Sequence, residues 1–82
     1  NLGLQSNIEK LKVYPNPART YLMIESEHAA LPNIIYLVHM DGRIEEYKTN
    51  TLSSHEIRIE HLKPGIYILK IGEARLPFVV KD

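Results

Sequence analysis

The sequence predicts an all-β domain, an antiparallel seven-stranded β-sandwich with Greek-key connections. Apolar and polar residues alternate with a period of two along most of the chain, as in strands that bury one face. Gly, Pro, Asn and Asp interrupt the alternation about every 8 to 12 residues, which is typical of turns between short strands. No window has helical spacing of apolar residues. An open barrel is the less favoured arrangement of the same strands.

Seven segments carry the alternation. Residues 34–38 are the most apolar and have apolar side chains on both faces, which predicts a central strand covered on much of both sides. Pro77 lies in the last segment, and because proline donates no ladder hydrogen bond, we expect that strand at a sheet edge. The predicted strands are residues 8–14, 21–25, 34–38, 43–49, 56–60, 66–71 and 76–80.

Three turns are predicted from their residue types. Asp41 and Gly42 suit a two-residue type I′ hairpin loop, which needs positive φ at both positions. Asn16 and Pro17 suit the first two positions of a type I turn. Lys-Pro-Gly-Ile at residues 63–66 suits a type II turn, in which the glycine takes positive φ.

Composition excludes several classes of function. The chain has 82 residues, ten Lys plus Arg against ten Asp plus Glu, and no Cys, which indicates one small domain without disulfides. Zero net charge argues against nucleic acid or an anionic membrane surface as partner. The longest apolar run is far shorter than the 18 or so residues of a membrane helix, so we expect no membrane insertion. Because the first residue is Asn1, we expect the chain to be a piece of something longer.

The sequence offers no catalytic or metal-binding constellation. Its four histidines include no pair at the close spacing typical of zinc sites. We expect His28 and His55 in solvated connections, and His39 half-buried on an apolar strand with one hydrogen bond. Glu45 and Glu46 are strand neighbours and should point to opposite faces, so they form no catalytic pair. We therefore expect no enzyme activity, no metal and no cofactor.

Three segments together resemble the C-terminal sorting domain, type A, of proteins exported by the bacterial type IX secretion system. The first is Val-Tyr-Pro-Asn-Pro-Ala at residues 13–18, followed by a short strand. The second runs from Ile34 into Gly42 and Arg43. The third joins Ile-Arg-Ile at residues 57–59 to residues 62–71, which begin with Leu-Lys-Pro-Gly-Ile-Tyr, and the terminal Val-Val-Lys at 79–81 closes it. Two departures from the family pattern are His39, where an Asp is common, and the final Asp82.

The resemblance implies an immunoglobulin-like sandwich that acts as a folded export address on a larger secreted protein. Residues 8–82 would be the sorting domain and residues 1–7 a linker from the upstream cargo. The cargo would enter the periplasm by an ordinary N-terminal signal, and the outer-membrane translocon would then recognise this domain. A surface sortase-like protease would usually remove the domain, leaving the cargo at the cell surface or outside the cell.

The resemblance also implies roles for individual residues. The candidates for translocon recognition are Lys81, Gly65, Tyr67 and Gly42. The residues of the structural turn motif are Tyr14, Pro15, Asn16 and Pro17. For Tyr67 we favour a structural interpretation, a corner tyrosine whose hydroxyl bonds to the backbone of the preceding turn. Lys81 is the better functional candidate, because packing does not call for a cation at the end of an apolar strand. A solubilising charge on an edge strand would look the same.

The alternative interpretation is a non-catalytic fibronectin III-like or carbohydrate-binding module of a secreted enzyme. The Leu-Lys-Pro-Gly-Ile-Tyr segment is compatible with such sandwiches. A sugar binder normally exposes coplanar aromatic rings, whereas this chain has no Trp and only Phe78 and five Tyr. A weak homodimer through an exposed sheet edge stays open in either case.

Overall fold

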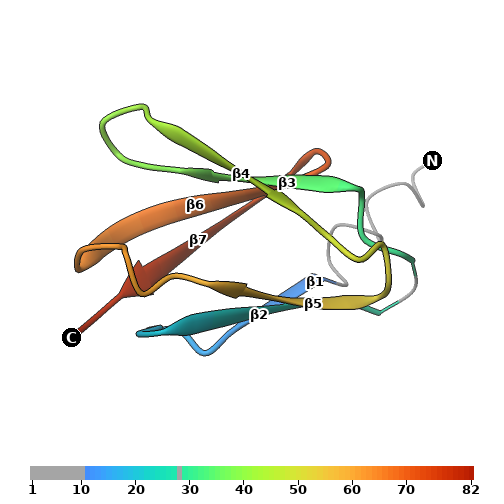
Figure 1. The fold of residues 1–82 in the computed structure, drawn as a ribbon, viewed down its shortest axis with the longest axis horizontal. Coiled ribbons are helices and arrows are strands. Elements are labelled where there is room, and N and C mark those ends of the chain that lie inside the picture. The colour runs from blue at the N-terminus through green and yellow to red at the C-terminus, as the bar shows by residue number, and fades with distance from the viewer. Residues whose placement is uncertain (1–10, 28) are drawn as a thin grey trace.

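Seven strands in two facing antiparallel sheets make up the part of the chain that the computed structural model describes, residues 11–27 and 29–82 (Figure 1). In these ranges no helix is long and apolar enough to cross a membrane. Each strand corresponds to one predicted from the sequence. They are β1 (Leu11–Tyr14), β2 (Tyr21–Ser26), β3 (Ile34–Val38), β4 (Ile44–Lys48), β5 (Ser54–Arg58), β6 (Gly65–Ile71) and β7 (Ala74–Val80).

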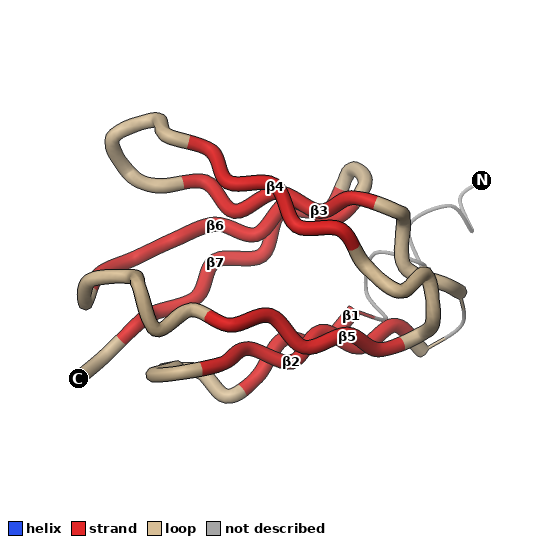
Figure 2. The backbone as a smooth tube through the Cα atoms, in the orientation of Figure 1, coloured by secondary structure: helices blue, strands red, loops and turns tan. Residues whose placement is uncertain are grey.

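The two sheets form the layers of a sandwich (Figure 2). One has the strand order β1-β2-β5 and the other β4-β3-β6-β7, and the chain crosses between them after β2, β4 and β5. This confirms the predicted all-β sandwich, and the order is compatible with an immunoglobulin-like arrangement. As predicted, β3 is central in its sheet, and β7, which contains Pro77, is an edge strand.

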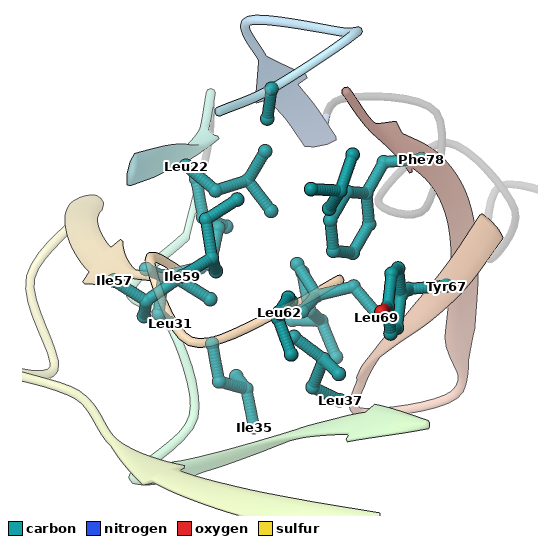
Figure 3. Close-up of a cluster of buried hydrophobic side chains, with 14 residues drawn as sticks. Leu22, Leu31, Ile35, Leu37, Ile57, Ile59, Leu62, Tyr67, Leu69 and Phe78 are labelled. Atoms are coloured by element: carbon teal, nitrogen blue, oxygen red, sulfur yellow. The ribbon is translucent and has the colours of Figure 1, made fainter. Parts of the chain in front are cut away.

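The core lies between the two sheets (Figure 3). Alternation sends every second side chain inward, and burying each of these aliphatic side chains contributes about 1.5–3 kcal/mol. The largest fully buried side chains are Phe78, Leu22, Ile24, Ile35, Leu37, Ile59 and Leu69. The outer face of β3 is covered only in part: Tyr36 is exposed there, whereas Ile34 and Val38 are half-buried. Because no third layer packs on this sheet among the described residues, this face is less covered than the sequence predicts.

The hairpin loop between β3 and β4 differs from the predicted two-residue type I′ loop. The amide of Gly42 donates to the carbonyl of His39 at 3.0 Å, and the amide of His39 donates to the carbonyl of Arg43 at 2.8 Å. Gly42 has φ +97°, whereas Asp41 is not among the residues with positive φ. This is a three-residue loop, a type I turn followed by a glycine bulge. The Asp-Gly pair suits both loops, so the residue types alone do not distinguish them.

The turns predicted at residues 63–66 and at Asn16–Pro17 are also wrong in type. Gly65 has positive φ, but at +156° it is far from the value near +80° of a type II turn, and it already pairs with Val80 as the first residue of β6. Asn16–Pro17 does not begin a hydrogen-bonded turn: residues 15–17 form bends, and the next residue, Ala18, forms an isolated parallel bridge to Val80. The Tyr14–Pro15 and Asn16–Pro17 peptides are both cis.

Smaller differences concern element bounds. His55 lies in β5 rather than in a polar connection, because β5 begins earlier than its apolar residues suggest. Residues 8–10 of the first predicted strand, the predicted linker at residues 1–7, and His28 lie outside the described residues.

Candidate functional site

The segments singled out in the sequence meet at one end of the sandwich, at the left of Figure 1. The pairing of Gly65 with Val80 sets the start of β6 beside the end of β7. A shallow hollow separates the β3–β4 loop from residues 64–67. We call this region the motif end and define it as residues 15–18, 39–43, 63–67 and 79–81.

Asn16 and Ala18, within and directly after the Tyr-Pro-Asn-Pro segment, are tied to the end of β7 by three hydrogen bonds. The side-chain oxygen of Asn16 accepts from the amide of Val79 at 3.0 Å. The amide of Ala18 donates to the carbonyl of Val79 at 2.7 Å, and the amide of Lys81 donates to the carbonyl of Ala18 at 2.8 Å. Residues more than 60 positions apart in the sequence are thereby held side by side.

Not every residue of that segment takes part. Tyr14 is exposed at the end of β1, and its hydroxyl donates to the carboxylate of Glu25, which raises the pKa of the phenol. Pro15 and Pro17 line a separate shallow hollow with Tyr21. Within the segment, Asn16 bonds to β7, whereas Tyr14, Pro15 and Pro17 do not line the hollow beside Gly65.

Tyr67 is a corner tyrosine, as the sequence predicted. Its side chain is only 7% exposed and its hydroxyl donates to the carbonyl of Lys63 at 2.6 Å. The ring stacks on Phe78 at a centroid distance of 5.8 Å (Figure 3). The ring of His39 meets it edge-on at a centroid distance of 5.2 Å. Because its ring is buried and its hydroxyl is hydrogen-bonded, Tyr67 supports the backbone of the motif end and presents little surface of its own.

Gly42 and Lys81 occupy exposed positions at the motif end. A Cβ at Gly42 would have no atom within 4 Å, so crowding does not require glycine here. The backbone φ of +97° does, because residues with a Cβ rarely adopt it. The side chain of Lys81 is exposed and makes no ion pair with any described residue. Its ammonium group is therefore available to a partner.

A cluster centred on Glu45 also lies at this end, and the sequence did not predict it. The Glu45 carboxylate lies 2.6 Å from Nε2 of His39 and 2.8 Å from Nε2 of His61, and it accepts from the hydroxyl of Tyr47 at 2.7 Å. The guanidinium of Arg43 lies 3.3 Å from Nδ1 of His39. His39 is only 9% exposed, so it is more deeply buried than the sequence predicts. Both of its ring nitrogens have a polar partner, whereas one hydrogen bond is predicted.

The cluster sets the ionisation of its members. Burial alone would raise the pKa of Glu45, but hydrogen bonds from His61, Tyr47 and His39 outweigh it and lower the pKa to about 2. Burial and the neighbouring carboxylate raise the pKa of Tyr47. Within residues 11–27 and 29–82 no group of three His, Asp or Glu side chains is arranged to hold a metal. The cluster joins β4 to the β5–β6 connection and braces the motif end.

Fold and motif end together define a small β-sandwich whose distinctive residues lie at one end of the molecule. The family of secretion system C-terminal sorting domains matches the chain over residues 12–81. Because the match covers most of the chain, this protein belongs to the family of type IX secretion C-terminal sorting domains. It carries a secretion signal for export through the outer membrane to the cell surface or beyond. No curated protein and no solved structure matches the chain.

Proposed function

We propose that this chain is a non-catalytic export signal that the type IX outer-membrane translocon reads as a folded domain, at or beside the motif end. The observation that carries the proposal is the convergence of Asn16, Gly65 and Lys81. They lie far apart in the sequence and meet through the hydrogen bonds and pairing of β7. A reader of linear sequence would not require that convergence, whereas a reader of surface shape would.

The motif residues take different roles in this proposal. The ammonium group of Lys81 contacts the machinery directly, because it is exposed and unpaired within the described chain. Gly42 and Gly65 set the backbone of the two segments beside the hollow. Tyr67 acts through the Lys63 carbonyl that it holds, since its own ring is buried.

The route of export follows from the same proposal. Residues 8–82 form the sorting domain and residues 1–7 link it to a cargo that has crossed the inner membrane into the periplasm. After the domain has passed the translocon, a sortase-like protease at the cell surface removes it. All covalent chemistry then belongs to the protease and none to this chain.

A reporter fusion tests the proposal. A fluorescent protein with an inner-membrane export signal is joined to residues 1–82 and expressed in a type IX-competent host and in a translocon-deficient one. We expect the reporter outside the cell only in the competent host, with a mass that lacks the domain. Equal retention in the periplasm of both hosts would contradict the proposal, and an exported reporter of full mass would contradict cleavage alone.

A further inference from the structure

The outer face of the β4-β3-β6-β7 sheet carries an apolar band. Strand pairing aligns Ile44, Val38, Ile68 and Pro77, one residue from each strand, in a single cross-strand row. Ile66 pairs with Val79 in the adjoining row toward the motif end. We call these six residues the outer-face band.

The fold itself does not require these apolar side chains. The core of the sandwich is formed by the opposite face of the same strands, through residues such as Leu37 and Leu69. Ile44 is 61% exposed and Ile66 is 54% exposed, Val79 and Pro77 are also exposed, and Val38 and Ile68 between them are half-buried. The solvent face of an antiparallel sheet normally carries polar side chains, and contiguous exposed apolar residues mark an interaction surface.

The charges around the band are mostly positive. The same face carries Lys48, Lys70 and Arg75 but only one carboxylate, Glu46, and none of the four is in an ion pair within the described residues. The alternation of β7, continued by one residue, places Lys81 on the side of Val79. The band therefore has a basic border that an acidic partner surface complements.

The edge of β7 is not free to accept an added strand. Pro77 has no amide hydrogen to donate, and both the amide and the carbonyl of Val79 are already bonded to Asn16 and Ala18. A partner on this side of the molecule consequently meets the face of the sheet and not its edge.

We propose that the outer-face band is the docking surface for a protein of the secretion machinery, one that presents an apolar patch bordered by Asp and Glu. This inference rests on the proposed function and extends it from the motif end to a whole sheet face. A second copy of the chain fits less well, because a two-fold contact would bring together two copies of a face that carries three cations and one carboxylate, so like net charges would meet.

Exposed isoleucines allow a test that spares the core. The double variant Ile44→Asp with Ile66→Asp removes two apolar side chains and adds acid to a basic surface. Leu52→Asp is the matched control, because Leu52 is 63% exposed in the connection between β4 and β5. Each chain is fused to the reporter, and its fold is checked by circular dichroism and urea unfolding. A second double variant, Lys70→Glu with Arg75→Glu, tests the basic border.

We expect every variant to fold and both double variants to lose export at least tenfold, with Leu52→Asp exported like wild type. Wild-type export from folded double variants would overturn the docking surface while leaving the sorting function intact. Absence of wild-type export from the competent host would instead overturn the proposed function and this inference with it. If sedimentation shows a wild-type dimer that the double variants lose, the occupant is a second copy and the machinery assignment is wrong.

Discussion

The hydroxyl of Tyr67 donates a 2.6 Å hydrogen bond to the carbonyl oxygen of Lys63, four residues earlier in the chain. This bond ties the end of the β5–β6 connection to β6 itself, at the place where the sequence predicts a type II turn. It also fixes the ring between His39 and Phe78, so that one side chain serves both the core and the wall of the motif end. Tyr67 therefore contributes both to the packing of the core and to the shape of the proposed signal surface.

Tyr67→Phe should therefore destabilise the domain. The ring packing remains, but the carbonyl of Lys63 loses its partner, at a cost of about 1–3 kcal/mol in the free energy of unfolding. Urea unfolding followed by circular dichroism measures the change. Tyr36→Phe is the control, because Tyr36 is exposed and its hydroxyl bonds to no described residue; it should change stability by less than about 0.5 kcal/mol. If Tyr67→Phe and Tyr36→Phe changed the unfolding free energy equally, the hydrogen bond from Tyr67 to Lys63 would not be stabilising.

Asn16 should stabilise the domain through its side-chain oxygen. In Asn16→Ala the amide of Val79 loses its 3.0 Å acceptor, and we expect a loss of about 0.5–1.5 kcal/mol in urea unfolding. Asn16→Asp keeps an oxygen in place and should retain most of the stability. If Asn16→Asp were as destabilising as Asn16→Ala, the acceptor would not be what matters at this position.

Glu45 should make stability depend on pH. Its pKa is about 2 in the fold and 4.5 without it, so the unfolded chain takes up the proton first as pH falls. The stabilisation is complete above about pH 5 and is lost as pH falls from about 5 to about 2. Because the carboxylate is 29% exposed and partly screened by solvent, we expect a loss of about 1–2 kcal/mol.

The groups that face Glu45 are His39, His61 and Tyr47, and Glu45→Gln isolates its part from theirs. Urea unfolding of both proteins at pH 6 and at pH 2.5 gives the comparison. The gap in stability between wild type and Glu45→Gln should narrow at the lower pH. A gap that stays constant would contradict the assigned pKa.

The strands were predictable because period-two alternation reports burial directly. Ile35 and Leu37 are buried as their spacing indicates, and Pro77 marks an edge strand because of its missing donor. The turn types were less accessible. Asp41 and Gly42 suit two loops that differ by one residue, and the choice follows from how His39 pairs with Arg43 across the hairpin.

The site was predictable only in part. Tyr67 could be assigned because the corner is local, four residues from its acceptor. The Glu45 cluster could not, because His61 is sixteen positions away and approaches from the connection between the sheets. The outer-face band was missed for a different reason. Two apolar faces on β3 indicate cover on much of both sides, whereas the outer face is exposed at Tyr36 and only half-buried at Ile34 and Val38.

Lys81→Ala should separate recognition from folding. The side chain is exposed and the backbone amide that bonds to Ala18 is unchanged, so the unfolding free energy should move by less than about 0.5 kcal/mol. Export of the fused reporter should fall several-fold. Lys12→Ala, an exposed lysine on β1 of the other sheet, is the control and should be exported like wild type. If Lys81→Ala were exported like wild type, the Lys81 side chain would not be part of the recognised surface.

If the machinery reads the folded sandwich, a variant that unfolds the core must lose export. Leu37 and Leu69 are both fully buried and pair across β3 and β6. Each Leu→Ala change costs about 2–5 kcal/mol, against about 4–12 kcal/mol of total stability for a chain of 82 residues. The double variant Leu37→Ala with Leu69→Ala should be unfolded by circular dichroism, whereas Leu52→Ala should not.

The decisive measurement is the fraction of total reporter found outside the competent host for these two variants, with the periplasmic reporter counted in the same cells. We expect the unfolded double variant to stay in the periplasm and Leu52→Ala to be exported like wild type. Wild-type export of a chain that circular dichroism shows to be unfolded would contradict this expectation, because the signal would then be read from linear sequence.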